Sequence, residues 1–287
     1  MLLLSIPSPH SGVVHAGPLS IRMYGLMLLL GIAACIALTG VRWTRRGGDW
    51  DLVFRVAVWG VGFGIVGARL YHDITSWNEV QAIHAWWAPF AVWKGGLGVW
   101  GGILFGCLAG AVVVRRSGNS VFAFMDAVAP GLLLAQGIGR IGNWWNQELF
   151  GKPTSLPWGL KIDIAHRPAG YELHSTFHPT FLYELVYDSV GVAILLLLDR
   201  RFRFRPPALF SLYVAYYCFG RFFEELLRID PAHHIAGLRL NAWVSIILFI
   251  GASIYFVHHQ FGWPRRPRRP QKEEKKPAMA IPKSRVR

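Results

Sequence analysis

The sequence carries little charge for its length. Of its 287 residues, only 16% are Asp, Glu, Lys or Arg, whereas 53% are hydrophobic and 14% are aromatic. Soluble globular domains carry about 25% charged residues, because their surfaces face water. The composition therefore excludes an ordinary soluble domain and indicates an integral membrane protein.

Cysteine is also scarce, and the positions of the three cysteines exclude two further classes. Cys35, Cys107 and Cys218 lie singly in separate apolar runs, so they form neither a disulfide framework nor a metal-binding motif. We interpret them as small apolar packing residues. Since the sequence has no cluster of His, Cys and Asp, we predict no metal and no organic cofactor. Residues 1–19 have neither the basic start nor the long apolar run of a signal peptide.

Seven apolar runs in the sequence are long enough, or nearly so, to cross a hydrocarbon core of about 30 Å. The runs are continuous rather than alternating, which argues against barrel strands. Only a helix satisfies every backbone group within one segment in lipid. We therefore predict an all-α membrane protein, with a bundle of about seven transmembrane helices in residues 1–260. The runs are Met23 to Val41, Leu52 to Leu70, Gly95 to Val114, Val121 to Ile138, Phe181 to Leu198, Ala208 to Leu227 and Ala242 to Val257.

Lys and Arg concentrate in alternate connections between these runs. The connections after the first, third and fifth runs are rich in arginine, and the tail beyond Trp263 holds ten more basic residues. Because basic connections stay in the cytoplasm, we predict an outward N-terminus and a cytoplasmic C-terminus. The arginines are Arg42, Arg45, Arg46, Arg115, Arg116, Arg200, Arg201, Arg203 and Arg205.

Much of the formal net charge of +14 lies in the C-terminal tail. Residues 261–287 are rich in Pro, Lys and Glu and have few apolar side chains to bury, so we predict a disordered, basic cytoplasmic tail. Such a tail could contact anionic lipids of the inner leaflet, or it could serve only to fix the orientation. Nothing else in the sequence supports nucleic-acid binding, and we expect none.

The segment from Gly137 to Gly151 places a polar cluster directly after the fourth apolar run. A guanidinium matches a phosphate with two parallel hydrogen bonds, and amides can hold the remaining oxygens. Glycine lets the backbone approach a ligand closely. The segment therefore predicts a site for an anionic lipid headgroup. The residues of this site are Arg140, Asn143, Asn146, Glu148 and Gly151.

The same segment also matches a nucleotide-binding pattern. Gly137, Gly139 and Gly142 have the G-x-G-x-x-G spacing, and Asp163 follows about twenty residues later, as in the dinucleotide fingerprint. That fingerprint requires a strand before the glycines and a helix after them, inside a soluble β-α-β unit. Here an apolar run of membrane length precedes the glycines, so we reject the nucleotide interpretation.

The sixth apolar run carries four polar residues on one helical stripe. Tyr217, Arg221, Glu225 and Arg228 are spaced at i, i+4, i+8 and i+11, which places them on one face of a helix. Ionisable groups within a membrane are costly and face a polar cavity or a partner. The stripe predicts a functional site near the outer boundary. The alternative is an Arg–Glu pair that only holds two helices together.

Three further motifs lie at the same predicted boundary. They are Tyr24-Gly-Leu in the first run, Arg69 at the end of the second, and His178-Pro-Thr-Phe-Leu-Tyr-Glu184 at the start of the fifth. Together with the segment and the stripe above, they resemble in order and position the motifs of bacterial phosphatidylglycerol–prolipoprotein diacylglyceryl transferases. The resemblance covers the chain from about Pro18 to Val257.

Two of these motifs can each be interpreted in two ways. Arg69 is either a contact to a lipid phosphate or an interfacial side chain that reaches toward water. Glu184 and Asp188 are four residues apart and project from one helical face. They either pair with an arginine of the bundle or take part in catalysis.

The resemblance implies transfer of a diacylglyceryl group from phosphatidylglycerol to the lipobox cysteine of a prolipoprotein, with release of glycerol phosphate. Arg140 and Arg239 would stabilise the departing phosphate, and the arginines would lower the pKa of the thiol. The loop 141–178 would form a small extracytoplasmic cap over the entrance. The implied catalytic residues are Arg140, Tyr24, Tyr217, Arg221 and Glu225; the implied phosphatidylglycerol contacts are Arg140, Asn143, Asn146, Glu148, Gly151, Arg228, Arg239 and Arg69.

The start of the third run departs from the family pattern. Many members have a histidine directly before a Gly-Gly pair, where this chain has Trp100. That histidine is the obvious candidate for a general base. Either another residue, such as His72 or His178, takes its place here, or the thiol needs no dedicated base. In the second case a nearby acceptor, such as Glu225, Tyr24 or Tyr217, takes the proton.

Two other functions remain open at this point. The protein could be a different membrane transferase acting on lipid headgroups, or a non-enzymatic lipid transporter or flippase with seven helices. The hydropathy of the two halves shows no inverted repeat of the kind many transporters have. The resemblance implies a multi-pass protein of the bacterial inner membrane whose partners are phosphatidylglycerol, prolipoprotein lipobox segments and the lipid bilayer. The sequence does not define the oligomeric state.

Overall fold

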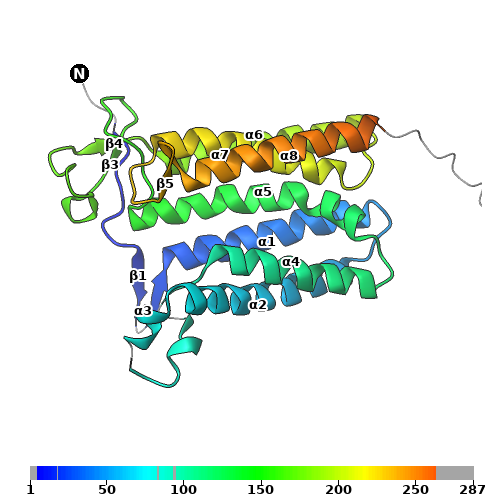
Figure 1. Ribbon diagram of the computed structural model, residues 1–287, viewed down its shortest axis with the longest axis horizontal. Helices are drawn as coiled ribbons and strands as arrows, with labels where there is room; N and C mark the ends of the chain where they lie inside the picture. The colour runs from blue at the N-terminus through cyan, green and yellow to red at the C-terminus, as the bar shows by residue number, and fades with distance from the viewer. Residues whose placement is uncertain (1–4, 18, 83, 93–94, 263–287) are drawn as a thin grey trace, which may run out of the picture.

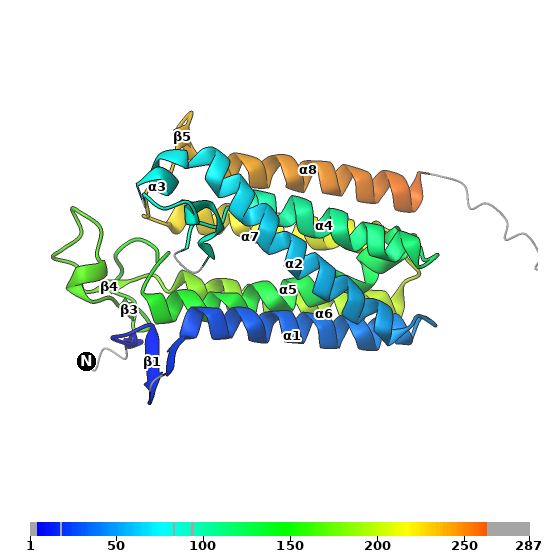
Figure 2. The ribbon, with the colours of Figure 1, turned by 90° about the horizontal axis from the view of Figure 1, so that it is seen from below.

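Seven long helices form the body of the molecule (Figure 1). The computed structural model describes residues 5–17, 19–82, 84–92 and 95–262. Within these residues the long helices run side by side as a bundle, which confirms the predicted all-α membrane fold (Figure 2). They are α1 (Met23–Thr44), α2 (Trp50–Thr75), α4 (Val99–Arg116), α5 (Val121–Asn146), α6 (Thr180–Arg201), α7 (Ala208–Leu227) and α8 (Leu240–Phe261).

In the described part of the chain, six of these helices are long and apolar enough to cross a membrane. The seventh, α7, has 20 residues, but Arg221, Glu224 and Glu225 make its last two turns polar. The helices alternate in direction, so α5 ends and α6 begins at the same end of the bundle, which we call the cap end. The opposite end, where α8 ends at Phe261, is the tail end.

Helix α5 is longer than the apolar run that predicted it. It continues beyond Ile138 to Asn146 and ends at Gln147, whose left-handed backbone (φ 51°, ψ 47°) stops the helix. The polar residues that we expected after the helix therefore belong to its last turns, because they face other helices rather than lipid. Gly137 and Gly142 are also helical, which excludes the strand–turn–helix of a dinucleotide site.

Helix α5 is the central helix of the bundle and contains Pro130. Of its most apolar stretch 44% is buried, against 22% or less in the other five apolar helices of the described chain. Proline lacks an N–H, so the carbonyl of Asp126, four residues earlier, has no helical partner. Arg42 of α1 supplies one: its Nη2 donates to the Asp126 carbonyl at 2.8 Å, and its Nε donates to Ala127 at 2.9 Å. The Asp126 carboxylate accepts the Phe210 amide at the start of α7. These bonds join α1, α5 and α7 near the tail end.

Helices α2 and α4 form a tightly packed pair along the lower edge of the bundle in Figure 1. Their glycines allow this, because no side chain separates the two backbones. A methyl group on Gly101 would lie 2.1 Å from the carbonyl oxygen of Gly67, and one on Gly106 would lie 3.0 Å from that of Gly60. Any larger residue at Gly67 or Gly101 would push the helices apart.

Residues 147–179 and the N-terminal segment form a small cap at one end of the bundle. Its core consists of Phe150, Leu160, Ile162 and Phe177. The backbone of Ile6 pairs with the strand at Leu160. We predicted a cap loop over 141–178, but residues 141–146 belong to α5, so the cap begins at Gln147.

The remaining elements are short. Within the described residues, three two-stranded antiparallel sheets lie at the cap end, and their strands are too short to show an alternating pattern in the sequence. The predicted basic tail falls on residues 263–287, which lie outside the described residues. The short elements are β1 (Val13–Ala16), β2 (Leu19–Arg22), α3 (Trp77–Gln81), η1 (Ala88–Phe90), β3 (Leu160–Lys161), η3 (Ile164–His166), β4 (Thr176–Phe177), β5 (His234–Ile235) and β6 (Leu238–Arg239).

Candidate functional site

Arg140 projects from α5 toward α6 near the cap end. Its Nη2 lies 2.7 Å from Oε1 of Glu184, and its Nη1 donates to the side-chain oxygen of Asn143 at 3.4 Å. The Arg140 side chain is 18% exposed and that of Glu184 is 5% exposed. Arg140 is therefore a largely buried cation, held by one carboxylate and one amide on two helices.

Asn143 connects Arg140 to the start of the cap. Its amide donates to Oε1 of Glu148 at 2.8 Å, and the amide of Asn146 donates to the same oxygen at 3.2 Å. Asn143 is 5% exposed, whereas Glu148 is exposed. The structure thus brings Arg140, Asn143, Asn146 and Glu148 together, as the sequence predicted, and orients both amides through one carboxylate.

Gly151 joins the cap to the end of α7. Its N–H donates to the carbonyl of His178 at 3.0 Å, and it pairs with Arg228 in a one-residue antiparallel bridge. A methyl group at Gly151 would lie 2.9 Å from the Cβ of His178. Glycine is required there because two other segments press against the backbone.

Arg221 of α7 lies among three carboxylates. Its Nη1 is 2.8 Å from Glu224 and 3.5 Å from Glu184, and its Nη2 pairs with Glu225. Glu184 therefore bridges Arg140 and Arg221, which links α5, α6 and α7. The predicted stripe on α7 thus faces the polar end of α5.

Two more arginines close the other side of Glu225. The Nε of Arg239 lies 2.6 Å from Glu225, and Nη1 of Arg228 lies 3.5 Å from it. Both arginines also pair with Asp230, at 2.7 Å for Arg228 and 2.8 Å for Arg239. Arg228 caps α7 in an extended conformation (φ −67°, ψ 145°), so it continues the predicted stripe in space but not as a helical residue.

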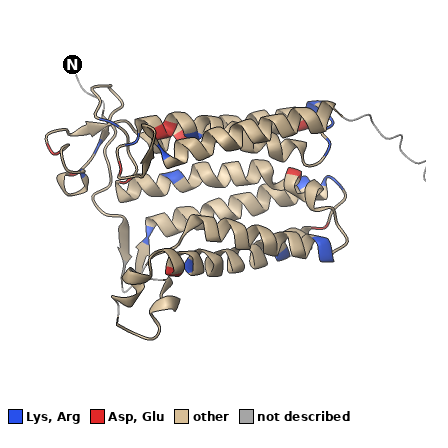
Figure 3. Ribbon diagram, in the orientation of Figure 1, with Lys and Arg blue, Asp and Glu red and all other residues tan. Residues whose placement is uncertain are grey.

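These contacts form one connected ion-pair cluster with equal numbers of opposite charges. Its two ends are Arg140 on α5 and Asp230 in the connection between α7 and β5. Burial raises the pKa of Asp230, but the hydrogen bonds and charges of Arg228 and Arg239 outweigh this effect and hold that pKa below its ordinary value. Figure 3 shows both signs of charge side by side at the cap end of α6 and α7. The cluster consists of Arg140, Arg221, Arg228, Arg239, Glu184, Glu224, Glu225 and Asp230.

A cavity of about 200 Å³ opens beside the ion-pair cluster, between α6 and α7. Tyr217, Glu184 and Asp188 line it. Asp188 has no solvent exposure, and within the described residues neither of its oxygens has a hydrogen-bond partner. An unpaired buried polar group costs free energy, so a ligand group in the cavity that reached Asp188 would gain a bond.

Tyr24 lies on the other side of α5. Its ring packs against Gly142, where a methyl group would come within 2.7 Å of the ring. Tyr24 is 42% exposed, so part of this side chain is accessible next to the last turns of α5. Both predicted tyrosines, Tyr24 and Tyr217, therefore flank the polar end of α5, but on opposite faces.

Arg69 lies apart from the ion-pair cluster and has a different role. It is 6% exposed, pairs with Asp73 at 3.0 Å, and donates to four backbone carbonyls of residues 88–96. These bonds occupy its Nε and both terminal nitrogens. Arg69 thus holds the connection between α2 and α4, and its contact to a lipid phosphate stays a prediction.

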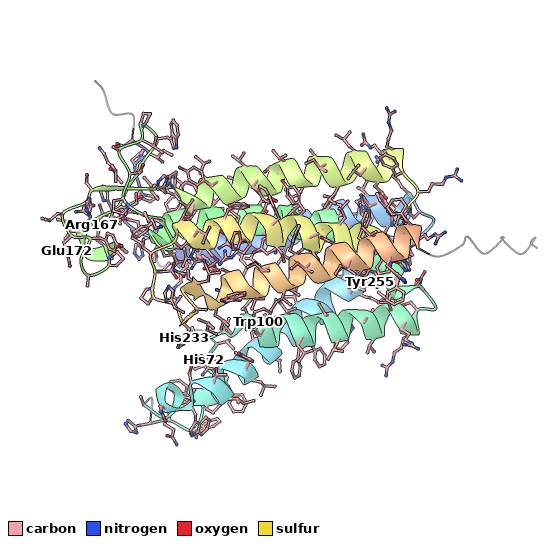
Figure 4. The ribbon with its side chains drawn as sticks, turned by 45° about the horizontal axis from the view of Figure 1, so that its top comes forward. His72, Trp100, Arg167, Glu172, His233 and Tyr255 are labelled. Atoms are coloured by element: carbon pink, nitrogen blue, oxygen red, sulfur yellow. The ribbon has the colours of Figure 1, made fainter. Side chains whose placement is uncertain are left out.

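Trp100 is the second residue of α4 and is 47% exposed. Figure 4 shows it at the cap end of the bundle, together with His72 and His233. The ring of His72 lies against Gly96, where a methyl group would come within 2.4 Å of Nε2. Trp100 therefore lies at the same end as the polar site without being part of the ion-pair cluster.

His178 lies in the cap connection, at the start of α6. Its Nδ1 is 3.1 Å from the hydroxyl of Tyr183. Partial burial, and then the positive charge of Lys152, lower the pKa of His178 below its ordinary value.

Two acidic residues of the site, Glu224 and Asp230, escaped the sequence prediction. Glu224 lies at i+3 from Arg221 and was missed because the stripe followed a spacing of four. The sequence does mark Glu224, because Glu224 and Glu225 are consecutive acidic residues in an apolar run. Asp230 lies beyond the run and follows no period. Glu184, which we expected either to pair with an arginine or to take part in catalysis, pairs with Arg140 and Arg221 between α5, α6 and α7. Among the described residues, no group of three His, Cys, Asp or Glu side chains is placed to bind a metal ion.

The sequence profile of one family, described as prolipoprotein diacylglyceryl transferase, matches residues 11–258. The chain belongs to this family. The resemblance seen in the motifs is thereby confirmed, and a bacterial multi-pass membrane protein is consistent with both the family and the six apolar helices of the described chain.

Several members of the prolipoprotein diacylglyceryl transferase family are close in sequence. A protein of Cutibacterium acnes is 49% identical over 255 residues, which cover 88% of this chain and 86% of its own. One of Frankia alni is 49% identical over 255 residues, 88% of this chain and 67% of its own. A third, of Streptomyces coelicolor, is 48% identical over 260 residues, 88% of this chain and 80% of its own. All three are named phosphatidylglycerol–prolipoprotein diacylglyceryl transferase.

Proposed function

We propose that this protein transfers the diacylglyceryl group of phosphatidylglycerol to the cysteine thiol of a prolipoprotein lipobox. The products are a thioether-linked protein and glycerol phosphate. The names of its relatives support this activity. The observation that carries it in the structure is Arg140, a largely buried cation at the open end of a balanced ion-pair cluster, with Asn143 beside it.

The lipid phosphate binds at Arg140. The guanidinium offers a planar fork that matches two phosphate oxygens. Asn143 and Asn146, which Glu148 already orients, supply amide groups for the hydroxyls of the glycerol headgroup. Gly151 brings the cap backbone close to this end of the bundle. Since the resting cluster is charge-balanced, an anionic headgroup competes with Glu184 for Arg140.

In the transfer step, the thiolate sulfur attacks the carbon of the diacylglyceryl group that carries the phosphate ester. The bond between that carbon and the phosphate ester oxygen breaks, and its electron pair stays on the oxygen of the leaving glycerol phosphate. Arg140 stabilises the negative charge that grows there. Arg239 uses its donors for Glu225, Asp230 and backbone carbonyls, so it acts by holding Glu225 in place.

The thiol is activated by electrostatics. Arginines near a thiol favour the thiolate, and Arg140 and Arg221 are the cations nearest the cavity. Both oxygens of Glu225 are engaged by arginines, which makes Glu225 a poor proton acceptor. The proton of the thiol passes to water at the cap end. Tyr24 and Tyr217 lie on the two faces of α5 at that end.

The protein spans the bacterial inner membrane with the cap outside. The arginines of the connections after α1, α4 and α6 lie at the tail end, which favours a cytoplasmic tail end and an outward N-terminus. The cap of residues 147–179 then lies on the side where secreted prolipoproteins emerge. The basic residues beyond Trp263 belong to the cytoplasmic side.

The direct test of this function is mass spectrometry of a lipobox peptide incubated with purified protein and phosphatidylglycerol. We expect the peptide to gain one diacylglyceryl group on its cysteine, with glycerol phosphate in equal amount. A matched peptide with serine in place of the cysteine should gain nothing. An unmodified cysteine peptide, with folded protein present, would contradict the proposal.

The same reaction separates the two rival functions. A transferase acting on headgroups would convert labelled phosphatidylglycerol into another phospholipid without modifying the peptide. A transporter or flippase would move labelled lipid between leaflets of a vesicle and form no product.

A further inference from the structure

A second cavity, larger than the one beside Asp188, lies far from the ion-pair cluster, between α2 and α4 toward the tail end. Its volume is about 750 Å³. The walls are apolar and aromatic: Trp59 and Phe63 on α2 face Leu108 and Val112 on α4. Each of these four side chains is 45–57% exposed, so the groove opens outward, where a membrane helix meets lipid.

The shape of this groove follows from the glycine packing of the two helices. Gly60 and Gly106 bring the backbones into contact, while large side chains stand on either side of the contact. On α4 the lining extends from Phe105 to Arg116, about 16 Å along the helix at about 1.5 Å per residue. One leaflet contributes about half of a 30 Å hydrocarbon core. The groove therefore has the length of one acyl chain in one leaflet.

Two arginines lie at the tail end of the groove. Arg55 lines it from α2 and Arg116 lines it from α4. Arg55 also pairs through its Nε with Asp51, one turn earlier on the same helix, at 2.9 Å, and its side chain is 50% exposed. Arg116 is exposed, and Ser117 beside it adds a hydroxyl to the lining. Apolar walls that end in two guanidinium groups complement an acyl chain that ends in a phosphate.

We propose that this groove binds an anionic phospholipid of the leaflet at the tail end, with one acyl chain between α2 and α4 and the phosphate between Arg55 and Arg116. The site takes no part in the transfer reaction, because it lies at the opposite end from Arg140. A zwitterionic lipid fits the groove less well, since its own cation opposes the two arginines. The proposal does not depend on the function proposed above.

The test uses Trp59 as a reporter. The protein is placed in phosphatidylcholine vesicles that contain a brominated lipid, either phosphatidylglycerol or phosphatidylcholine, because bromine quenches a tryptophan it touches. The chain has 13 tryptophans. The quenching at Trp59 is therefore obtained as the difference in quenched fluorescence between each protein and the same protein with Trp59→Phe. We expect brominated phosphatidylglycerol to occupy this place roughly fivefold to tenfold better than brominated phosphatidylcholine, given the attraction of each arginine for an anionic surface.

The controls distinguish a built site from a basic surface. Arg115 is adjacent to Arg116 and equally exposed, but it does not line the groove. We expect Arg116→Gln and the double variant Arg55→Gln, Arg116→Gln to lose the preference for phosphatidylglycerol, and Arg115→Gln to keep it. Equal losses in Arg115→Gln and Arg116→Gln would overturn the proposal, as would an absence of preference at Trp59 in the unchanged protein.

Discussion

Arginines occur at both ends of the bundle, but in opposite surroundings. At the cap end, the side chains of Arg140, Arg221, Arg228 and Arg239 are only 6–18% exposed, and each pairs with at least one carboxylate. At the tail end, most arginines of the connections are exposed to solvent. Burying a charge costs free energy unless it is paired, and exposed arginines are enough to set the orientation in the membrane. The buried arginines of the cap end therefore indicate a functional site, whereas the exposed arginines of the tail end serve to orient the protein.

The strongest way to break the cap end is to neutralise Glu225, which is engaged by three arginines. We expect Glu225→Gln to lower turnover at least roughly 10³-fold, because the preorganised charges around the site lose their centre. Arg221→Ala should have a similar effect. Both variants should still insert in the membrane, which the amount of protein in isolated membranes measures alongside turnover.

A purely structural Glu225 would behave differently. In that case the single variants would be lost from the membrane, since a broken buried pair leaves an uncompensated charge. Replacing Arg221 and Glu225 together by apolar residues would then restore both protein and activity. Recovered activity in that double variant would decide against a catalytic cluster.

The tail end offers a contrast in Arg42, which is buried, pairs with Asp199 at 3.3 Å, and donates to the Asp126 carbonyl that Pro130 leaves without a helical partner. We expect Arg42→Met to lower the stability by about 1–3 kcal/mol, because that carbonyl loses its partner, while kcat per folded molecule stays unchanged. Thermal unfolding and turnover of the same preparation measure the two effects. A lower kcat at unchanged Tm in Arg42→Met would contradict the assignment of a purely structural role to Arg42.

A smaller effect is expected at Trp100, which occupies the position where many relatives have histidine. If the arginines activate the thiol, an imidazole is dispensable, and Trp100→Phe should keep substantial activity, because Phe preserves most of the apolar ring surface. Turnover with the lipobox peptide tests this. Loss of activity in Trp100→Phe would show that the indole itself has a role in the site.

The smallest effect is expected at His178. Its pKa is lowered in the folded protein by partial burial and by Lys152, so the unfolded chain binds the proton more tightly. The stability contributed by neutral His178 is therefore present above about pH 6.5, the ordinary value, and is lost as the pH falls through the lowered folded value. In His178→Gln this pH dependence should disappear, as unfolding measured from pH 5 to 8 would show.

His178→Gln also tests the rival base. If His178, or His72, accepted the thiol proton, its replacement by Gln would remove an ionisation near neutral pH from the rate profile. We expect both variants to keep the profile of the unchanged protein. A folded His variant that binds phosphatidylglycerol but is inactive at pH 7 would replace the electrostatic mechanism with a histidine base.

Much of the fold could be predicted from hydropathy, because each long helix had to present an apolar surface to lipid. The run Ala208 to Leu227 coincides with α7. The continuation of α5 to Asn146 could not be predicted, because polar residues that face other helices look like the end of a span. Helix α8 is also longer than its predicted run at both ends, since it extends from Leu240 to Phe261 rather than from Ala242 to Val257.

The site was predicted where residues repeat along one helix, and missed where contacts join separate segments. Arg221 and Glu225 follow from spacing alone. The link from Arg140 to Glu184, and that from Glu225 to Arg239, cross between elements, and no local pattern specifies such partners. Arg69 shows the same limit, because an arginine at a membrane boundary gives no sign of the carbonyls it binds.

The central claim is that the fork of Arg140 holds the lipid phosphate, and kcat/KM for phosphatidylglycerol in Arg140→Lys tests it most directly. Lysine keeps the positive charge but cannot supply two parallel donors. Arg115→Lys, the same change at the tail end, is the matched control. We predict that Arg140→Lys loses at least roughly a hundredfold in kcat/KM, while Arg115→Lys matches the unchanged protein. Near-normal turnover by folded Arg140→Lys would contradict the account.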